Sequence, residues 1–204
     1  MQYNSAANAT LLNYAAPIWV ALFAWLVHKE KLALLFWIGL ACTLLGMAVV
    51  LSGDFFRHPS VGRGDLLAIV SSFFYAGYFI VTESGRKRMD TLSYIWMVGV
   101  SSTLTMAVVV LSLGLPFSGY PAQTYWAFFG EALFSQIGGY LAIGDALGHL
   151  PASVVSPTMV GQPVLTALLA MPLLGEKLVS IQIMGGLVVL VGVYWVHRGR
   201  MSAR

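Results

Sequence analysis

The stretch PIWVALFAWLVHKEKLALLFWIGLACTLLGMAVVLSG at residues 17–53 is matched, 146 positions later, by PVLTALLAMPLLGEKLVSIQIMGGLVVLVGVYWVHRG at residues 163–199. Both stretches contain Glu-Lys-Leu, at 30–32 and at 176–178. In each, three glycines at seven-residue spacing follow, at 39, 46 and 53 and at 185, 192 and 199. Single apolar matches arise by chance in such a composition, but this combination indicates a duplicated segment.

The composition of the chain places it in a lipid bilayer. Charged residues make up 9% of the 204 residues, hydrophobic residues 58%, and the mean hydropathy is +0.80. Soluble domains carry roughly 25% charge, so a water-soluble fold is excluded. Apolar runs long enough to cross a bilayer lie at 8–27, 34–52, 66–82, 92–113, 125–146, 152–174 and 180–196. They lack the two-residue alternation of barrel strands, so we expect an all-α integral membrane protein of about seven transmembrane helices.

The basic residues act as topology signals. With seven spans, three clusters lie on one side of the membrane: Lys29 with Lys31, the run 86–88, and the arginines after residue 196. Lysine and arginine are enriched in cytoplasmic loops, so we expect a cytoplasmic C-terminus in a multi-pass inner-membrane protein. The net charge of +3 is spread over these loops, and a nucleic-acid partner is not expected.

The two copies of the repeat have opposite orientations. Five expected spans separate the two Glu-Lys-Leu loops, and an odd number puts the loops on opposite faces. Inverted repeats are typical of secondary transporters. The chain then divides into the last two spans of a first repeat (1–54), an external loop (55–63), a complete second repeat (64–199) and a cytoplasmic tail (200–204). By this count three helices of the first repeat would precede Met1.

This pattern resembles the EamA-type transporters of the drug/metabolite transporter superfamily. The likeness rests on the stretch from Ala6 through Pro17 to Glu30, on its counterpart 152–176, and on the glycine-containing helix after each. The resemblance implies a five-plus-five inverted-repeat fold and a bacterial-type inner-membrane exporter of small metabolites that works by alternating access. The chain departs from the family in lacking the first three helices.

A polar stripe on each copy of the first repeated helix is the candidate substrate path. At about 100° per residue, Thr10, Asn13 and Pro17 share one helix face, and Ser156 and Pro163 share the equivalent face. Polar groups are costly in lipid, so these faces should line the bundle interior. The expected cavity residues are Thr10, Asn13, Tyr14, Pro17, Tyr75, Tyr78, Gln136, Ser153, Ser156, Gln162 and Pro163. Interhelical hydrogen bonds and core packing are the alternative explanation.

Other residues have narrower expected roles. Glu131 is the deepest charge in any expected span and is the candidate proton carrier, with Ser135 and Gln136 as possible hydrogen-bond partners; a structural acid is the alternative. Glu30 and Glu176 should each begin the following helix, where an acid complements the dipole. Close helix packing is expected at Gly39, Gly46, Gly185 and Gly192.

These features define the expected function. The four histidines lack metal-ligand spacing, no cofactor is expected, and neither HExxH nor GxSxG is present, so the chain is not expected to be an enzyme. We expect a secondary transporter exporting small amino-acid-like or drug-like metabolites, with proton coupling as one form. A non-transporting truncated remnant or a membrane scaffold subunit is the alternative. The expected partners are the lipid bilayer, a small-molecule substrate and, to complete the pathway, a second copy of the chain.

Overall fold

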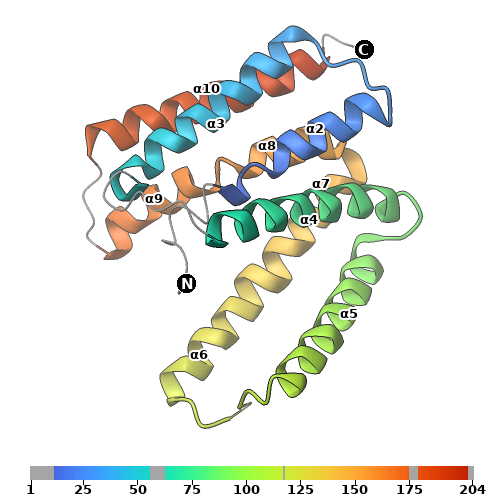
Figure 1. Cartoon of the computed structure of the whole chain (residues 1–204), viewed down its shortest axis with the longest axis vertical. Helices are drawn as coiled ribbons and strands as arrows, with labels where there is room; N and C mark the ends of the chain where they lie inside the picture. The colour runs from blue at the N-terminus through green and yellow to red at the C-terminus, as the bar shows by residue number, and fades with distance from the viewer. Residues whose placement is uncertain (1–11, 56–62, 117, 175–178, 202–204) are drawn as a thin grey trace. The chain divides into compact units, whose positions relative to one another are not determined.

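The computed structural model describes residues 12–55, 63–116, 118–174 and 179–201, and all regular structure in these ranges is helical. Figure 1 shows the arrangement of the helices. In chain order they are α2 (Ala16–Leu26), α3 (Leu34–Phe55), α4 (Arg63–Arg86), α5 (Thr91–Ser112), α6 (Ala122–Glu131), the π-helix η1 (Ala132–Gly139), α7 (Tyr140–His149), α8 (Ala152–Met159), α9 (Gln162–Leu174) and α10 (Ser180–Met201). This result confirms the expected all-α membrane fold.

The helices correspond to the expected spans, with two interruptions. Four segments in the described ranges are long and apolar enough to cross a membrane, and two shorter apolar helices accompany them. The long segments are Gly64–Arg86, Thr91–Ser112, Ala152–Leu169 and Ser180–Met201, and the shorter ones are Ala16–Leu26 and Leu34–Val50. The span expected at 125–146 is formed by α6, η1 and α7 without a gap. The first and sixth spans, by contrast, are broken near their middle.

The chain forms two compact units, which are described separately. Unit 1 comprises Met1–Ile80 and Ala152–Arg204, and unit 2 comprises Val81–Pro151. The boundary falls inside α4. Unit 1 therefore combines helices from both copies of the repeat.

In unit 1, α3 and α10 pack against each other along their length. They are repeat equivalents, because a shift of 146 residues carries Leu34–Phe55 onto Ser180–Met201. A Cβ on Gly39 would lie 2.7 Å from the Gly192 carbonyl oxygen, and one on Gly46 would lie 2.8 Å from that of Gly185. Residue numbers rise along one helix as they fall along the other, so the pair is antiparallel (Figure 1). An inverted repeat requires this orientation.

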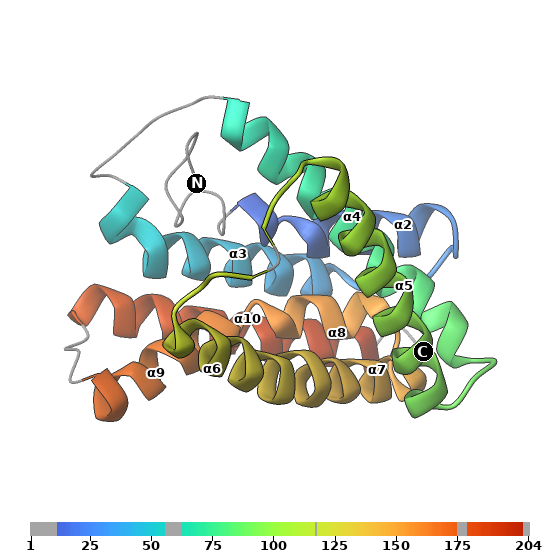
Figure 2. The same ribbon diagram turned by 90° about the horizontal axis from the view of Figure 1, so that it is seen from below.

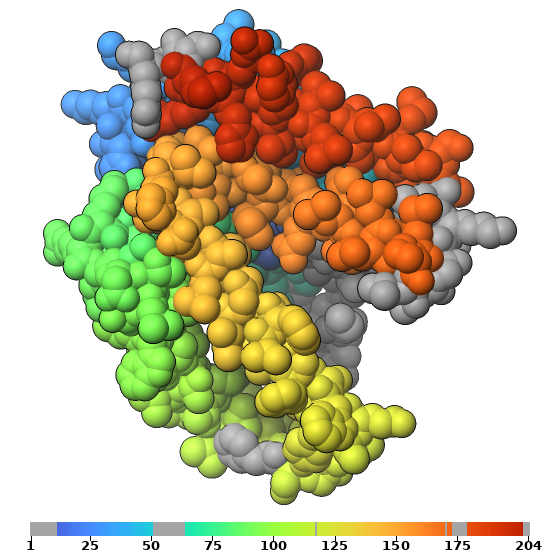
Figure 3. Space-filling view, turned by 180° about the vertical axis from the view of Figure 1, so that it is seen from behind, coloured from blue at the N-terminus to red at the C-terminus, as the bar shows by residue number. Residues whose placement is uncertain are grey.

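Side chains beside this contact form the core of unit 1. Lipid tails are as apolar as leucine, so close packing rather than water exclusion holds helices together in a bilayer. Figure 3 shows α10, in red, alongside the orange segment that contains α8 and α9. One buried cluster joins α2, α3 and α10, and another joins α3, α10 and the α8–α9 segment. The first consists of Ala21, Phe36, Leu40 and Val196, and the second of Met47, Val160, Val164 and Val189.

α2 has defined contacts at its end and on its side. Its C-terminus leads to Lys29, whose φ of 52° is left-handed, and the Glu30 N–H donates to the Ala24 carbonyl oxygen at 2.9 Å. On its side, the Trp19 indole Nε1–H donates to the buried Ser72 Oγ of α4 at 3.0 Å. These contacts fix the direction in which the chain leaves α2 toward α3.

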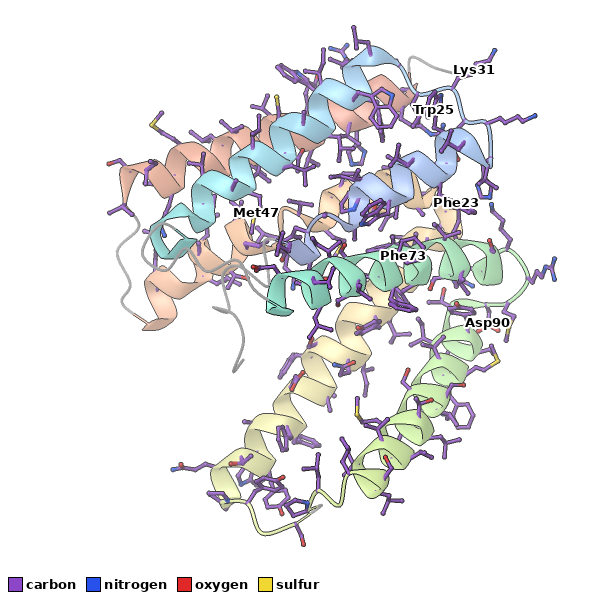
Figure 4. All side chains as sticks on the ribbon, viewed as in Figure 1. Phe23, Trp25, Lys31, Met47, Phe73 and Asp90 are labelled. Carbon is purple, nitrogen blue, oxygen red and sulfur yellow. The ribbon has the colours of Figure 1, made fainter. Side chains whose placement is uncertain are left out.

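Unit 2 is organised around the turn from α4 to α5. The Asp90 carboxylate accepts the Ser93 N–H at 3.0 Å and so caps α5, at whose start Figure 4 places it. The Tyr94 ring lies against Gly85, where a Cβ would meet it, and its hydroxyl donates to Thr82 Oγ1 at 3.3 Å. Glycine at position 85 therefore allows α4 and α5 to approach closely.

The arginine at the end of α4 joins α7 to this turn. The Arg86 Nε–H donates to the Gly144 carbonyl oxygen at 2.9 Å. A Cβ on Gly148 would lie 2.7 Å from the Arg86 guanidinium, so a larger residue at position 148 would require this flexible side chain to shift. Thr91 Oγ1 donates to Asp145 Oδ1 at 3.1 Å, which links α5 to α7.

Candidate functional site

Two helix breaks lie at repeat-equivalent positions in unit 1. Residues 12–13 are helical, 14–15 form a turn, and α2 begins at Ala16. α8 ends at Met159, 160–161 form a turn, and α9 begins at Gln162. The hydrogen bonds of the two turns also correspond. The Ala15 N–H donates to the Leu12 carbonyl oxygen at 3.1 Å, as the Gly161 N–H does to that of Thr158 at 3.0 Å. The Ile18 N–H donates to the Ala15 carbonyl oxygen at 2.9 Å, as the Val164 N–H does to that of Gly161 at 3.1 Å. The breaks are the same structure formed twice.

A proline after each break explains its position. Pro17 and Pro163 are the second residues of α2 and α9, where a missing N–H does not interrupt the new helix. A proline cannot donate to the carbonyl four residues earlier. The Asn13 and Met159 carbonyl oxygens therefore lack an α-helical donor, and a continuous helix across either position is disfavoured.

The breaks lie deep in apolar segments. Val160 is roughly 12 Å along the helix axis from Ala152, at 1.5 Å per residue. Irregular backbone at membrane depth is tolerated only where protein buries it or where it lines a cavity. Figures 1 and 2 show α2 and α9 extending from the breaks in opposite directions, as expected for helices from inverted copies.

The first break brings several predicted cavity residues together. Half-buried Tyr14 packs against the core cluster that contains Val160, the turn residue of the second break. Asn13 Oδ1 accepts a hydrogen bond from Ser71 Oγ of α4 at 3.4 Å. Tyr75 of α4 lies near Tyr14. The polar groups at this break therefore face α4 and the second break.

Tyr75 and Tyr78 form a stacked aromatic pair on α4. Their ring centroids are 6.1 Å apart with an interplanar angle of 7°. Phe79 packs edge-on against both rings and is buried. Through Tyr75, the pair lies next to the first break.

The two serines of α8 have different surroundings. Ser156 and Ser153 are both 1% exposed. Ser156 Oγ has no hydrogen-bond partner in the described part of the chain, which is a costly arrangement for a buried hydroxyl. Ser153 Oγ donates to Glu30 Oε2 at 3.0 Å. A ligand hydroxyl, carbonyl or amine could therefore bond to Ser156, whereas Ser153 is already occupied.

Glu30 does not have the role expected from the sequence. The expectation that it begins the following helix is wrong, because α3 starts only at Leu34 and has no acid in its first turn. Instead, Glu30 Oε2 lies 3.1 Å from Arg200 Nη1 of α10, and the side chains of the two residues are 15% and 19% exposed. The sequence signal for this contact is the Glu-Lys-Leu motif, but nothing in the motif indicates its partner. Its counterpart Glu176 lies outside the described residues.

The other predicted residues are exposed or lie outside the described ranges. Thr10 is outside the described residues, and Gln162 is exposed at the start of α9. Glu131 and Gln136 belong to unit 2 and are exposed. Glu131 ends α6 and directly precedes η1, and no hydrogen bond joins it to Ser135 or Gln136 in the structure. A π-helical segment of this kind is often found at functional sites.

Metal ligands do not converge in the described ranges. No group of three or more histidine, cysteine, aspartate or glutamate side chains could hold an ion there. His197 Nε2 lies 2.9 Å from Thr158 Oγ1, which itself donates to the Val154 carbonyl oxygen, so the imidazole is the donor. The break region thus offers neutral hydroxyl, amide and aromatic groups.

Membrane helices packed as antiparallel repeat equivalents, with paired breaks in the apolar spans, are typical of membrane transporters built from inverted repeats. The comparison with protein families agrees: the profile of the EamA-like transporter family matches residues 1–52 and 62–198. The chain belongs to the EamA-like transporter family.

Individual relatives carry transporter or solute-carrier names. An uncharacterized transporter of Synechocystis is 27% identical over 87% of this chain and 54% of its own length. The uncharacterized transporter YdfC of Bacillus subtilis is 24% identical over 95% of this chain and 63% of its own length. Human solute carrier family 35 member G1 is 26% identical over 72% of this chain and 42% of its own. The chain thus spans about half to two thirds of the two bacterial relatives.

A solved crystal structure has the same fold. It superposes with a TM-score of 0.79 over 98% of this chain and 68% of its own, at 17% sequence identity. At this identity the likeness concerns the fold alone.

Proposed function

We propose that this chain moves small metabolites across a membrane by alternating access, with the substrate bound beside the two helix breaks. The observation that carries the proposal is the equivalence of the breaks at 14–15 and 160–161, which share one buried cluster. Transporters built from inverted repeats hold their substrates between the repeats, at discontinuous helices.

The groups around the breaks favour a small amphipathic substrate. Asn13, Tyr14, Tyr75 and Ser156 supply neutral hydrogen-bonding groups, and the stacked tyrosine pair supplies an aromatic surface. Binding sites of this composition orient a ligand with a few polar contacts and enclose its apolar part. Amino-acid-like and drug-like molecules fit this description. From the family likeness we propose export across an inner membrane, and from the distribution of lysine and arginine we propose a cytoplasmic C-terminus.

We further propose Glu131 as the site of proton coupling. The carboxylate lies within the apolar run at 125–146, which we expect to span the membrane, and directly precedes η1. Protonation would remove its charge and change the cost of exposing this part of unit 2 to lipid.

The alternative proposal is a non-transporting membrane subunit, and a homodimer is a further way to complete a pathway. The same flux measurement distinguishes transport from the alternative.

The experiment is counterflow in liposomes that contain only this chain. Vesicles preloaded with each member of an amino-acid and amphipathic-drug panel should accumulate the same radiolabelled compound for at least one member. Ser156→Leu and Asn13→Leu should abolish that accumulation, because a bulky apolar side chain fills the proposed site. Ser101→Leu, the matched control on an exposed position of α5, should retain it. Wild-type rates in Ser156→Leu would refute the site, and no accumulation of any compound would favour the non-transporting subunit.

A further inference from the structure

Three polar residues connect the two copies of the repeat at one end of unit 1. Glu30 comes from the segment after α2, in the first copy, whereas Ser153 and Arg200 come from α8 and α10, in the second. Both partners contact the same carboxylate oxygen: Ser153 Oγ at 3.0 Å and Arg200 Nη1 at 3.1 Å from Glu30 Oε2. Ser153 is 1% exposed, so this contact is largely removed from solvent.

The positions related to this cluster by the 146-residue repeat carry different residue types. A shift of 146 residues pairs Glu30 with Glu176, but it pairs Arg200 with Asp54 and Ser153 with Ala7. A glutamate, an aspartate and an alanine cannot reproduce a carboxylate held by a guanidinium and a hydroxyl. The internal symmetry therefore holds for the helix breaks and the glycines and fails at these polar positions.

We propose that Glu30, Ser153 and Arg200 form a polar latch that closes one face of the transport pathway, and that the repeat-equivalent positions 176, 7 and 54 do not form the same latch. This inference rests on the proposed function. Alternating access requires the two copies of the repeat to move against each other, so a contact between the copies at one face must separate when that face opens. The resting state is then closed on the side of Glu30.

The exposure of the latch suits a contact that opens and closes. Ion pairs in full solvent contribute little, while breaking a fully buried pair is strongly destabilising. With side chains 15% and 19% exposed, this pair lies between these extremes. It can favour the closed state without preventing opening.

The test measures access to the middle of α8 from each side of the membrane. Ser156→Cys is made in a Cys42→Ala background, which removes the only native cysteine. Labelling by a membrane-impermeant maleimide is then timed in right-side-out and inside-out vesicles. Glu30→Gln and Arg200→Gln should each speed labelling from the latch side by roughly five- to thirtyfold. Ser153→Ala, which removes one hydrogen bond and keeps the ion pair, should speed it by about two- to fivefold.

Several controls separate a latch from a purely structural contact. Figure 4 shows Lys31 extending away from the ribbon, so Lys31→Gln removes a charge from the same segment without touching the latch and should leave the labelling rate unchanged. Charge exchange, Glu30→Arg with Arg200→Glu, should restore slow labelling. Local unfolding would speed labelling from both sides, whereas an opened latch speeds it from one.

Two results would overturn the latch: wild-type labelling rates in Glu30→Gln and Ser153→Ala, or equal acceleration from both sides. Labelling reports access and needs no flux. One-sided acceleration in a chain that moves no compound would therefore uphold the latch and refute the proposed function.

Discussion

Replacing Gly192 by alanine should destabilise the contact between α3 and α10. A Cβ at this position would lie 2.6 Å from the Thr43 backbone nitrogen and 2.8 Å from the Gly39 carbonyl oxygen. Both neighbours are backbone atoms of α3, which cannot rotate away as a side chain could. The helices must separate to accommodate the methyl group.

The structure sets the size of this effect. Overpacking a filled site costs about 1–3 kcal/mol, and we expect the upper half of this range because the neighbours are backbone atoms. Alanine regains up to about 1 kcal/mol relative to glycine within a helix. The net loss in the free energy of unfolding should be about 1–2 kcal/mol. Gly99→Ala is the matched control: nothing lies within 4 Å of its Cβ, so it should be neutral or stabilising by up to about 1 kcal/mol.

The assay is equilibrium unfolding of the purified chain in mixed micelles, with increasing amounts of sodium dodecyl sulfate and helicity as the signal. Gly192→Ala should unfold at lower detergent fraction than wild type, and Gly99→Ala at the same fraction or higher. Equal midpoints for the two variants would show that the backbones of α3 and α10 are not as close as the structure places them.

Two further predictions concern unit 2. The Ser93 N–H bonded to the carboxylate lowers the pKa of Asp90, so the cap contributes stability above the ordinary carboxyl pKa and loses it as the pH falls through the lowered value. Asp90→Ala should lower the unfolding midpoint at pH 7, with helicity as the signal. The midpoint of the variant should also change less than that of wild type as the pH becomes acidic, and an unchanged pH profile would show that the cap contributes nothing. Glu131→Gln should abolish transport driven by a proton gradient while counterflow continues, and gradient-driven transport at the wild-type rate would exclude Glu131 as the proton carrier.

The sequence predicted the helical spans because they depend on local composition. A run without charge, such as 180–196, must become a helix in lipid to satisfy its own backbone. The glycine spacing similarly predicted a close helix contact, and the structure places Gly39 against Gly192. Both inferences need only periodicity and the repeat.

The surroundings of individual polar residues could not be predicted in this way. Helical periodicity put Ser153 on the same face as Ser156, yet Ser153 bonds to Glu30, a residue 123 positions away in an irregular segment. Helical periodicity predicts the direction in which a side chain points from its own helix. It does not predict which residues of a distant loop contact that side chain. Likewise, periodicity placed Pro17 and Pro163 on equivalent helix faces but did not predict the matching turns before them.

Substrate protection tests directly whether substrate binds beside the paired helix breaks. The labelling rate of Ser156→Cys, in the Cys42→Ala background, is measured with and without a compound that the chain accumulates in counterflow. Bound compound should slow labelling at this position severalfold and leave the labelling of Ser101→Cys on α5 unaffected. Equal rates at position 156 with and without saturating compound would contradict binding beside the breaks.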